Sequence, residues 1–151
     1  MSEKGFRIRK VRSVDLQSIK RISDSRLRED YSLDLLSYFI ENHSQCFHVA
    51  EVNNEVVGFI IGVPLDNKTL RILMLAVTEE YSRNGIGSGL FEKCLDHAKL
   101  RMMTALNLEV STLNESAYEF YRNRGFKVTG ILPKYYKDKT DAYIMKRFIV
   151  M

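Results

Sequence analysis

A short run of alternating glycines, set between a strand-like segment and a helical pattern, constrains the fold more than any other feature. The segment Asn84-Gly85-Ile86-Gly87-Ser88-Gly89 follows the apolar run from Leu70 to Val77. After it, Leu90, Cys94 and Ala98 recur at four-residue spacing, which is typical of one helix face. The first N–H groups of a helix have no partner within the helix, and glycine lets a ligand approach the backbone. We therefore expect a strand, a turn and a helix whose start can hold an anion such as phosphate.

The glycines alone leave two interpretations open, because such a turn also occurs where the chain only packs tightly. Two well-known phosphate loops are excluded. A dinucleotide-binding fingerprint needs glycine three residues after Gly87, where Leu90 stands. A P-loop ends in Gly-Lys-Ser/Thr, which this segment lacks.

The rest of the chain predicts a single domain, residues 1–151, in which strands and helices are mixed. A first helix is expected to begin at residues 13–15, and three further helices are expected to cover 33–41, 86–99 and 114–124. Strands are expected at 6–10, 46–52, 56–63, 70–77, 106–110, 127–132 and 142–148. Asn53-Asn54-Glu55 predicts a hairpin. The order predicts an α+β (mixed α/β) fold: a mixed, mostly antiparallel sheet of about seven strands, with about four helices on its faces.

Composition narrows the class of protein. No apolar run approaches a membrane span and no signal peptide is evident, so we expect a cytoplasmic protein. The two cysteines lack metal spacing, so no metal is expected. The net charge is +4 and no nucleic-acid motif accompanies it, so no specific nucleic acid is expected. Two basic clusters are either solvated surface or attract phosphates or an acidic partner: Arg7, Arg9, Lys10 and Arg12, and then Lys134, Lys137 and Lys139.

A second group of residues carries acid–base chemistry. Glu109 ends a predicted strand, Asn114 begins the next helix, and Tyr121 lies two helical turns further on. If the strand end and the helix face converge on one cleft, a carboxylate and a phenol there supply a base and an acid. The alternatives are a solvated Glu109, a core aromatic at Tyr121 and an Asn114 that only caps its helix.

Four motifs in this order resemble the GNAT superfamily of N-acetyltransferases over nearly the whole chain. The segment from Tyr81 to Leu90 is similar to the family's acetyl-coenzyme A loop. Four later segments resemble the next motif of the family: Leu108-Glu109-Val110, Asn114-Glu115-Ser116-Ala117, Phe120-Tyr121-Arg122 and Gly125-Phe126. The ending, Tyr135-Tyr136 and then Asp141-Ala142-Tyr143-Ile144-Met145, resembles protein N-terminal acetyltransferases: the RimI-type alanine acetyltransferases and the co-translational catalytic subunits.

The resemblance implies a role for each matching position. Acetyl-coenzyme A is the expected cosubstrate, bound by the backbone of Leu75, Ala76, Val77, Arg83, Asn84, Gly85, Ile86, Gly87 and Ser88, and by Asn114 and Tyr121. Tyr121 is the expected acid and Glu109 the expected base, with Glu29 as the alternative base. Leu27, Glu29, Tyr31, Tyr135 and Tyr136 are expected to contact the substrate. Two residues depart from the family pattern. Where Ser82 stands, the pattern usually has Arg or Gln, and where Ser111 stands, the RimI type usually has Arg.

The implied activity is acetyl transfer from acetyl-coenzyme A to the N-terminal α-amine of proteins or peptides, by direct attack in a ternary complex. Two alternatives stay open: a GNAT enzyme for an internal lysine or a small amine such as a polyamine, and a non-catalytic module that binds acetyl-coenzyme A as a sensor or subunit. A ribosome or an auxiliary subunit is a candidate partner. The chain is expected to be a monomer or a homodimer, without a membrane partner.

Overall fold

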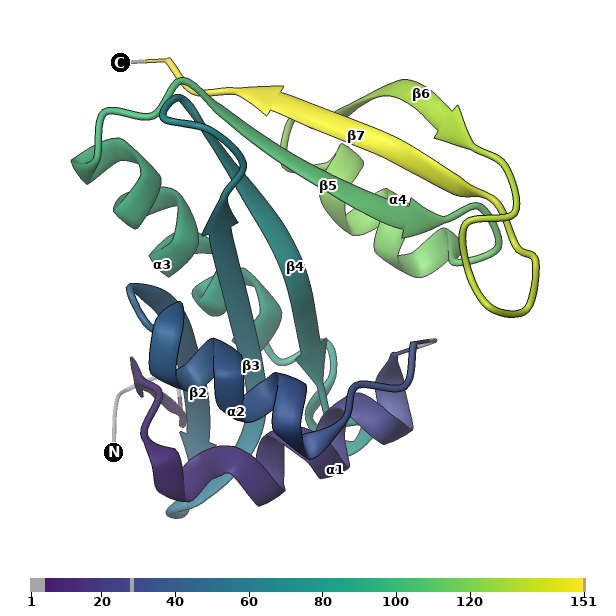
Figure 1. Ribbon diagram of the computed structural model, residues 1–151. Coiled ribbons are helices and arrows are strands. Elements are labelled where there is room, and N and C mark those ends of the chain that lie inside the picture. The colour runs from purple at the N-terminus through teal and green to yellow at the C-terminus, as the bar shows by residue number, and fades with distance from the viewer. Residues whose placement is uncertain (1–4, 28, 151) are drawn as a thin grey trace. The chain divides into compact units, whose positions relative to one another are not determined.

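The computed structural model describes residues 5–27 and 29–150 (Figure 1). Within these residues the helices are α1 (Leu16–Arg26), α2 (Leu33–Asn42), α3 (Ile86–Leu100) and α4 (Glu115–Arg122), with 3-10 turns η1 (Ser13–Asp15) and η2 (Glu79–Tyr81). The strands are β1 (Arg7–Lys10), β2 (Cys46–Val52), β3 (Glu55–Pro64), β4 (Thr69–Val77), β5 (Ala105–Ser111), β6 (Lys127–Leu132) and β7 (Ala142–Phe148). This is the predicted order of elements.

The strands form one sheet in the order β1-β2-β3-β4-β5-β7-β6. β4 and β5 pair in parallel, whereas β1–β2, β2–β3, β5–β7 and β6–β7 pair antiparallel. The mixed, mostly antiparallel sheet is therefore confirmed. The predicted hairpin is also confirmed, because Asn53 and Asn54 both have positive φ (50° and 65°), as a type I′ turn requires.

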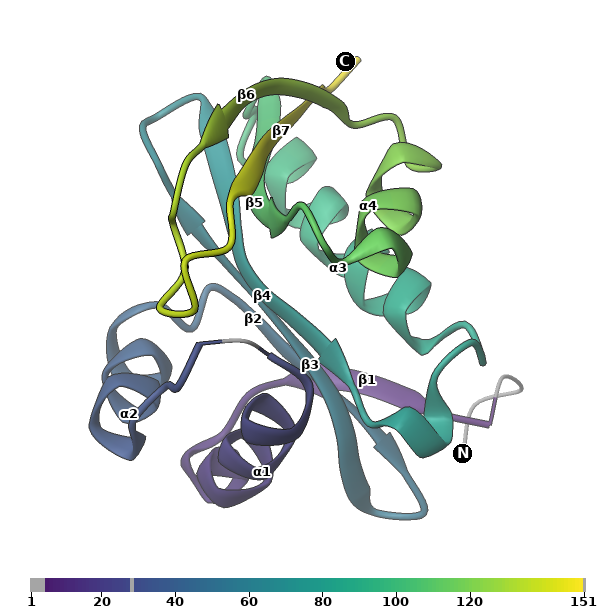
Figure 2. The ribbon, with the colours of Figure 1, turned by 90° about the vertical axis from the view of Figure 1, so that its right-hand side faces the viewer.

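The contacts divide the chain into two compact units, and β4 contributes to both. The first unit contains the described residues up to 63 together with 74–97; the second contains 64–73 and the described residues from 98 onward. In the first unit, α1 and α2 lie on one face of β2 and β3, and α3 lies on the other (Figure 2). Large side chains fill its core, among them Ile19, Ile22, Leu36, Phe47, Phe59 and Phe91, all less than 2 % exposed.

The glycines near the start of α3 have different structural roles. Gly85 has a φ of 84°, a conformation that favours glycine. A Cβ atom on Gly89 would lie 2.8 Å from Cδ1 of Ile8 and 3.2 Å from Cε2 of Phe6. Gly89 is therefore needed for close packing of α3 against the first strand, whereas Gly85 is needed for the turn. The packing interpretation of the glycine run thus holds at Gly89, and anion binding at the turn stays a prediction.

The second unit has its core between α4 and one face of β5 and β7. Leu106, Leu108, Val110 and Met145 are buried there together with Phe126. The ring of Tyr118 on α4 lies 5.5 Å from the ring of Tyr143 on β7. Val110 pairs with Tyr143 across the strands, so both side chains point to the face that α4 covers. Figures 1 and 2 both show α4 alongside β5 and β7.

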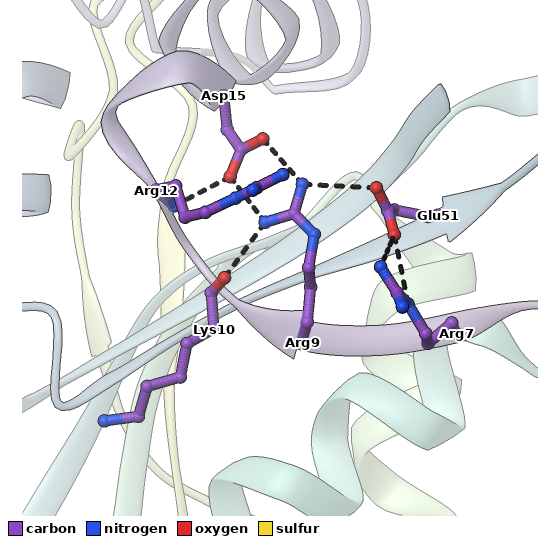
Figure 3. A network of polar contacts seen from close by, with 6 residues as sticks. All are labelled: Arg7, Arg9, Lys10, Arg12, Asp15 and Glu51. Carbon is purple, nitrogen blue, oxygen red and sulfur yellow. Dashed lines mark hydrogen bonds and ion pairs between the residues drawn. The ribbon is translucent and has the colours of Figure 1, made fainter. Parts of the chain in front are cut away.

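Two residues of the first basic cluster, Arg7 and Arg9, take part in a network of ion pairs, whereas Lys10 and Arg12 are exposed (Figure 3). Arg9 donates from Nη1 and Nη2 to the two carboxylate oxygens of Asp15, at 2.9 and 2.8 Å, and from Nη2 to Glu51, at 3.3 Å. Arg7 donates to Glu51 at 2.7 Å. The side chains of Arg9, Asp15 and Glu51 are only 16 %, 4 % and 10 % exposed. The network joins β1 to β2 and to the turn before α1.

The network also shifts the pKa of both carboxyl groups. Burial by itself raises the pKa of Asp15, but hydrogen bonds from the Arg9 guanidinium and the Arg12 backbone N–H outweigh it and hold the pKa below its usual 3.8. For Glu51, burial again raises the pKa, and Arg7 and Arg9 together bring it below 4.5. Because both pKa values are depressed by folding, the stability that they contribute is present above the unfolded values and is lost as the pH falls through the folded ones.

We expect Arg9→Met to lower the free energy of unfolding by about 3 kcal/mol at pH 7, because it leaves two buried carboxylates without their shared partner. The deficit relative to the wild type should shrink as the pH falls below 4, where the carboxylates become protonated. Urea unfolding followed by circular dichroism at pH 7 and pH 3 measures both quantities. Lys10→Met, on the same strand with an exposed side chain, is the matched control and should cost little. A deficit that is independent of pH would contradict this account of the network.

Candidate active site

The polar cluster around Glu109 is built by the register of two parallel strands. Leu70 pairs with Leu106 and Arg71 with Asn107. Side chains alternate along a strand, so Arg71, Asn107 and Glu109 share one face of the second unit. This is the face opposite to the one that α4 covers. The sequence therefore places a carboxylate and a guanidinium on the same open side of the sheet.

Two side chains, those of Arg71 and Tyr135, contact Glu109. Arg71 donates from Nη2 to Oε1 of Glu109, forming an ion pair. The same Nη2 donates to the Tyr135 hydroxyl at 3.1 Å, and that hydroxyl donates to Oε1 of Glu109 at 3.4 Å. The Glu109 side chain is 11 % exposed and the Arg71 side chain 32 % exposed. Glu109 is thus a desolvated, partnered carboxylate at the surface of the sheet rather than a solvated strand end.

Arg71 was not among the predicted site residues. The signal in the sequence was its charge, because it is the only charged residue in the apolar run from Leu70 to Val77. Its partners are 38 and 64 residues away along the chain, and no local pattern names them.

The loop between β6 and β7 brings Tyr135 to this cluster and has an ordered internal structure. Asp141 accepts from the backbone N–H of Lys134 at 2.8 Å, and the N–H of Tyr136 donates to the carbonyl of Thr140 at 3.2 Å. The rings of Tyr135 and Tyr136 lie edge to face, 4.9 Å apart. Tyr135 is therefore held over the open face near Glu109, and Tyr136 lies beside it. Their contact with a substrate stays a prediction.

Tyr121 approaches β5 from the other face. It lies on α4, is 8 % exposed, and its ring contacts those of Phe120 and Phe126 at 5.2 and 5.4 Å. The helix is fixed to this face by Tyr118 against Tyr143 and by Arg147, whose Nη1 donates to the carbonyl of Arg124 at 3.0 Å. Glu109 and Tyr121 thus lie on opposite faces of one strand. An acid and a base that act on different atoms of a reaction do not need to touch each other.

Asn114 is an N-cap. Its side-chain Oδ1 accepts from the backbone N–H of Ala117 at 3.1 Å, which satisfies one of the donors at the start of α4. At the other end, the N–H of Phe126 donates to the carbonyl of Tyr121 and Gly125 has a φ of 89°, as in a glycine-terminated helix. Contact between Asn114 and a cofactor stays a prediction.

The predicted phosphate-binding turn lies in the first unit, immediately before α3. Arg83 and Gly85 both have positive φ, at 66° and 84°. The N–H of Gly89 donates to the carbonyl of Gly85 at 3.0 Å, which completes the first helical turn. The N–H groups of residues 86–88 lie in that turn, where a helix binds anions. Among the predicted strand residues before it, Ala76 is 5 % exposed, and Leu75 and Val77 are half-buried.

The predicted substrate segment, residues 27–31, also belongs to the first unit. Leu27, Glu29 and Tyr31 are half-buried, and Arg28 lies outside the described residues. Lys20 holds the segment in place, because its Nζ donates to the carbonyl of Tyr31 at 2.8 Å and to Asp30 at 3.2 Å. Glu29 and Glu109 therefore belong to different compact units.

Other features of the described chain carry no predicted site residue. A surface hollow of about 510 Å³ is lined by Tyr118, Arg122, Asn123, Gly125, Phe126, Lys127 and Val128. Cys46 and Cys94 are buried in the core of the first unit. In the part of the chain that the structure describes, no group of three or more His, Cys, Asp or Glu residues is placed to hold a metal ion. No helix in that part is long and apolar enough to span a membrane.

The mixed sheet, the glycine-rich helix start and the partnered carboxylate fit a transferase that holds a phosphate-bearing cosubstrate. Residues 14–126 match the model of the acetyltransferase (GNAT) family. The chain belongs to this family and is an acetyl-coenzyme A-dependent N-acetyltransferase. The expectation drawn from the motifs is thereby confirmed, and the non-catalytic alternative is set aside.

Known proteins similar to this chain agree with the assignment. An N-alpha-acetyltransferase of Sulfurisphaera tokodaii is 32 % identical over 94 % of this chain and 92 % of its own length. The crystal structure of Ard1 from Thermoplasma volcanium has a TM-score of 0.92 and 36 % identity, covering 97 % of this chain and 99 % of that one. Arabidopsis thaliana Naa50, in complex with the bisubstrate analogue CoA-Ac-MVNAL, has a TM-score of 0.82 and 25 % identity, covering 95 % and 98 %.

We expect Asn114→Ala to destabilise the protein by about 1 kcal/mol, because the cap on α4 is lost, and Asn114→Asp to keep the cap and the stability. Urea unfolding measures both. If the side-chain amide also donates to the cofactor arm, Asn114→Asp should weaken acetyl-coenzyme A binding in calorimetry while stability is unchanged. An Asn114→Ala variant as stable as the wild type would show that the cap contributes nothing.

Proposed function

We propose that this enzyme transfers the acetyl group of acetyl-coenzyme A to the N-terminal α-amine of proteins or peptides. The observation that carries the proposal is the partnered carboxylate Glu109, held on the open face beside the tyrosine-bearing loop. An extended peptide that reaches this face with its first residue would present its amine to a base. The bisubstrate analogue bound by Arabidopsis Naa50 joins coenzyme A to a peptide through an acetyl group, which supports a ternary complex in which the two substrates meet directly.

The choice of an α-amine follows from its acidity. The nucleophile must be neutral, and an α-ammonium has a pKa of about 7.7–8.0 against about 10.4 for lysine. Near pH 7 roughly a tenth of free α-amines are already neutral, but fewer than about one lysine in a thousand. A carboxylate that receives one proton, directly or through a water, is then sufficient help for an α-amine. A lysine side chain would need more help than this to lose its proton.

Glu109 would take the amine proton as the amine attacks the thioester carbonyl. Backbone N–H groups of the strand preceding α3 would support the developing oxyanion, and the first turn of α3 would hold the pyrophosphate. Tyr121 would protonate the departing thiolate from the opposite side of β5. Glu29 is the competing base, and a Glu109→Gln variant with full activity near pH 7 would transfer the role to it.

The substrate class is tested by thiol release from acetyl-coenzyme A against three kinds of amine. These are short peptides with different free first residues, one of the same peptides with a blocked N-terminus and an internal lysine, and spermidine. We expect turnover with free N-termini alone. Turnover confined to the blocked lysine peptide or to spermidine would refute the substrate while leaving the family intact.

Tyr121→Phe should keep acetyl-coenzyme A affinity unchanged and lower kcat by about a hundredfold or more, because the ring packing is retained while the proton donor is lost. Tyr118→Phe is the matched control: it lies one turn earlier on the same helix, against Tyr143, and should stay active. Calorimetry and thiol release give the two quantities. A fully active Tyr121→Phe enzyme would remove Tyr121 from the acid role.

A further inference from the structure

The contacts at Glu109 are asymmetric. Arg71 and Tyr135 both donate to Oε1, and no described residue donates to Oε2. The carboxylate is therefore held through one oxygen, and its second oxygen stays available for an amine or a water. Donors on one oxygen also fix the plane of the carboxylate, which sets the direction in which the second oxygen can accept a proton.

The contacts also balance charge on this face. Glu109 carries a negative charge next to the positive charge of Arg71, and Tyr135 bridges them as a neutral group. The other charged residue on this face of β7 is Lys146, which pairs with Asn107 and whose Nζ lies 5.1 Å from the ring of Phe148. An amine bound at Oε2 would therefore meet a carboxylate whose charge is already compensated.

Resting on the function proposed above, we infer that Arg71 is a positioning residue for the acetyl transfer. Its guanidinium holds Glu109 and Tyr135 in place, and its charge keeps the acceptor amine unprotonated in the bound complex. A lone carboxylate would attract a substrate ammonium and retain its proton, which blocks nucleophilic attack. The ion pair removes most of that attraction, so the carboxylate can orient the amine without stabilising the ammonium.

The charge and the hydrogen bonds of Arg71 can be separated by two substitutions. Arg71→Gln keeps an amide that can donate to Glu109 but removes the charge. Arg71→Lys keeps the charge but loses the planar group that reaches both partners. Arg101→Gln, which removes one positive charge from the exposed turn after α3, is the matched control. Circular dichroism checks the folding of each variant, since the chain has no tryptophan to report on it.

The test is the pH dependence of kcat at saturating substrates, from pH 6 to 9.5, with the amine that the wild-type enzyme accepts best. For Arg71→Gln we expect the acidic limb of the kcat–pH profile to shift to higher pH by about one unit. At pH 7 kcat should therefore fall about tenfold, and at high pH it should recover. Arg71→Lys should restore the position of the limb, and Arg101→Gln should leave it unmoved. A loss that is equal at every pH, or a profile that superimposes on the wild type, would overturn the role of Arg71.

A binding measurement tests the same role of Arg71 without turnover. With coenzyme A present at pH 6.5, a peptide with a free N-terminus should bind Arg71→Gln several-fold more tightly than the wild type, while the N-acetylated peptide binds both equally. Equal affinities for the free peptide would overturn the inference. Failure of the proposed function is a separate outcome: the wild-type enzyme would then acetylate lysine peptides or spermidine instead of free N-termini. In that case the pH profiles of the Arg71 variants can still be compared on the amine that is acetylated.

Discussion

The position of β5 between two strands is the constraint on which the second unit depends. On one side β5 pairs in parallel with β4 at Thr69–Arg71, and on the other it pairs antiparallel with β7 along its whole length, from Ala105 to Ser111. Because this register is fixed on both sides, alternation along the strand fixes the direction of every side chain. Val110 faces α4, and Glu109 faces the opposite, open side. A slip of one residue would exchange a buried valine for a carboxylate.

The same strand therefore separates two chemical environments. The face with α4 is apolar and close-packed, and it holds Tyr121 between two aromatic rings. The other face carries Arg71, Glu109 and Tyr135, which satisfy one another. The first unit uses buried charge in a comparable way at Arg9, Asp15 and Glu51. The difference lies in what the carboxylate is left to do: Asp15 accepts on both oxygens, whereas Glu109 accepts on one.

Local features of the sequence were predictable. β2, β6 and β7 have the predicted bounds because apolar alternation and turn residues mark their ends. The cap at Asn114 and the glycine-rich start of α3 follow from short-range patterns as well. Contacts between distant segments were not predictable from such patterns. Nothing near Arg71 indicates that Tyr135, 64 residues later, accepts a hydrogen bond from it, and nothing near Arg9 indicates that Glu51 does so. Arg9 stands among exposed basic residues, and its own segment does not show that its side chain is largely buried.

The central claim is that this enzyme acetylates an α-amine in preference to a lysine. The most direct measurement uses one peptide that carries both a free N-terminus and an internal lysine, incubated with acetyl-coenzyme A and the enzyme, with the modified position read by tandem mass spectrometry. Both amines then compete under the same conditions. The account predicts acetyl on the N-terminal residue and an unmodified lysine at early turnover. Acetyl on the lysine first, with the N-terminus still free, would contradict it.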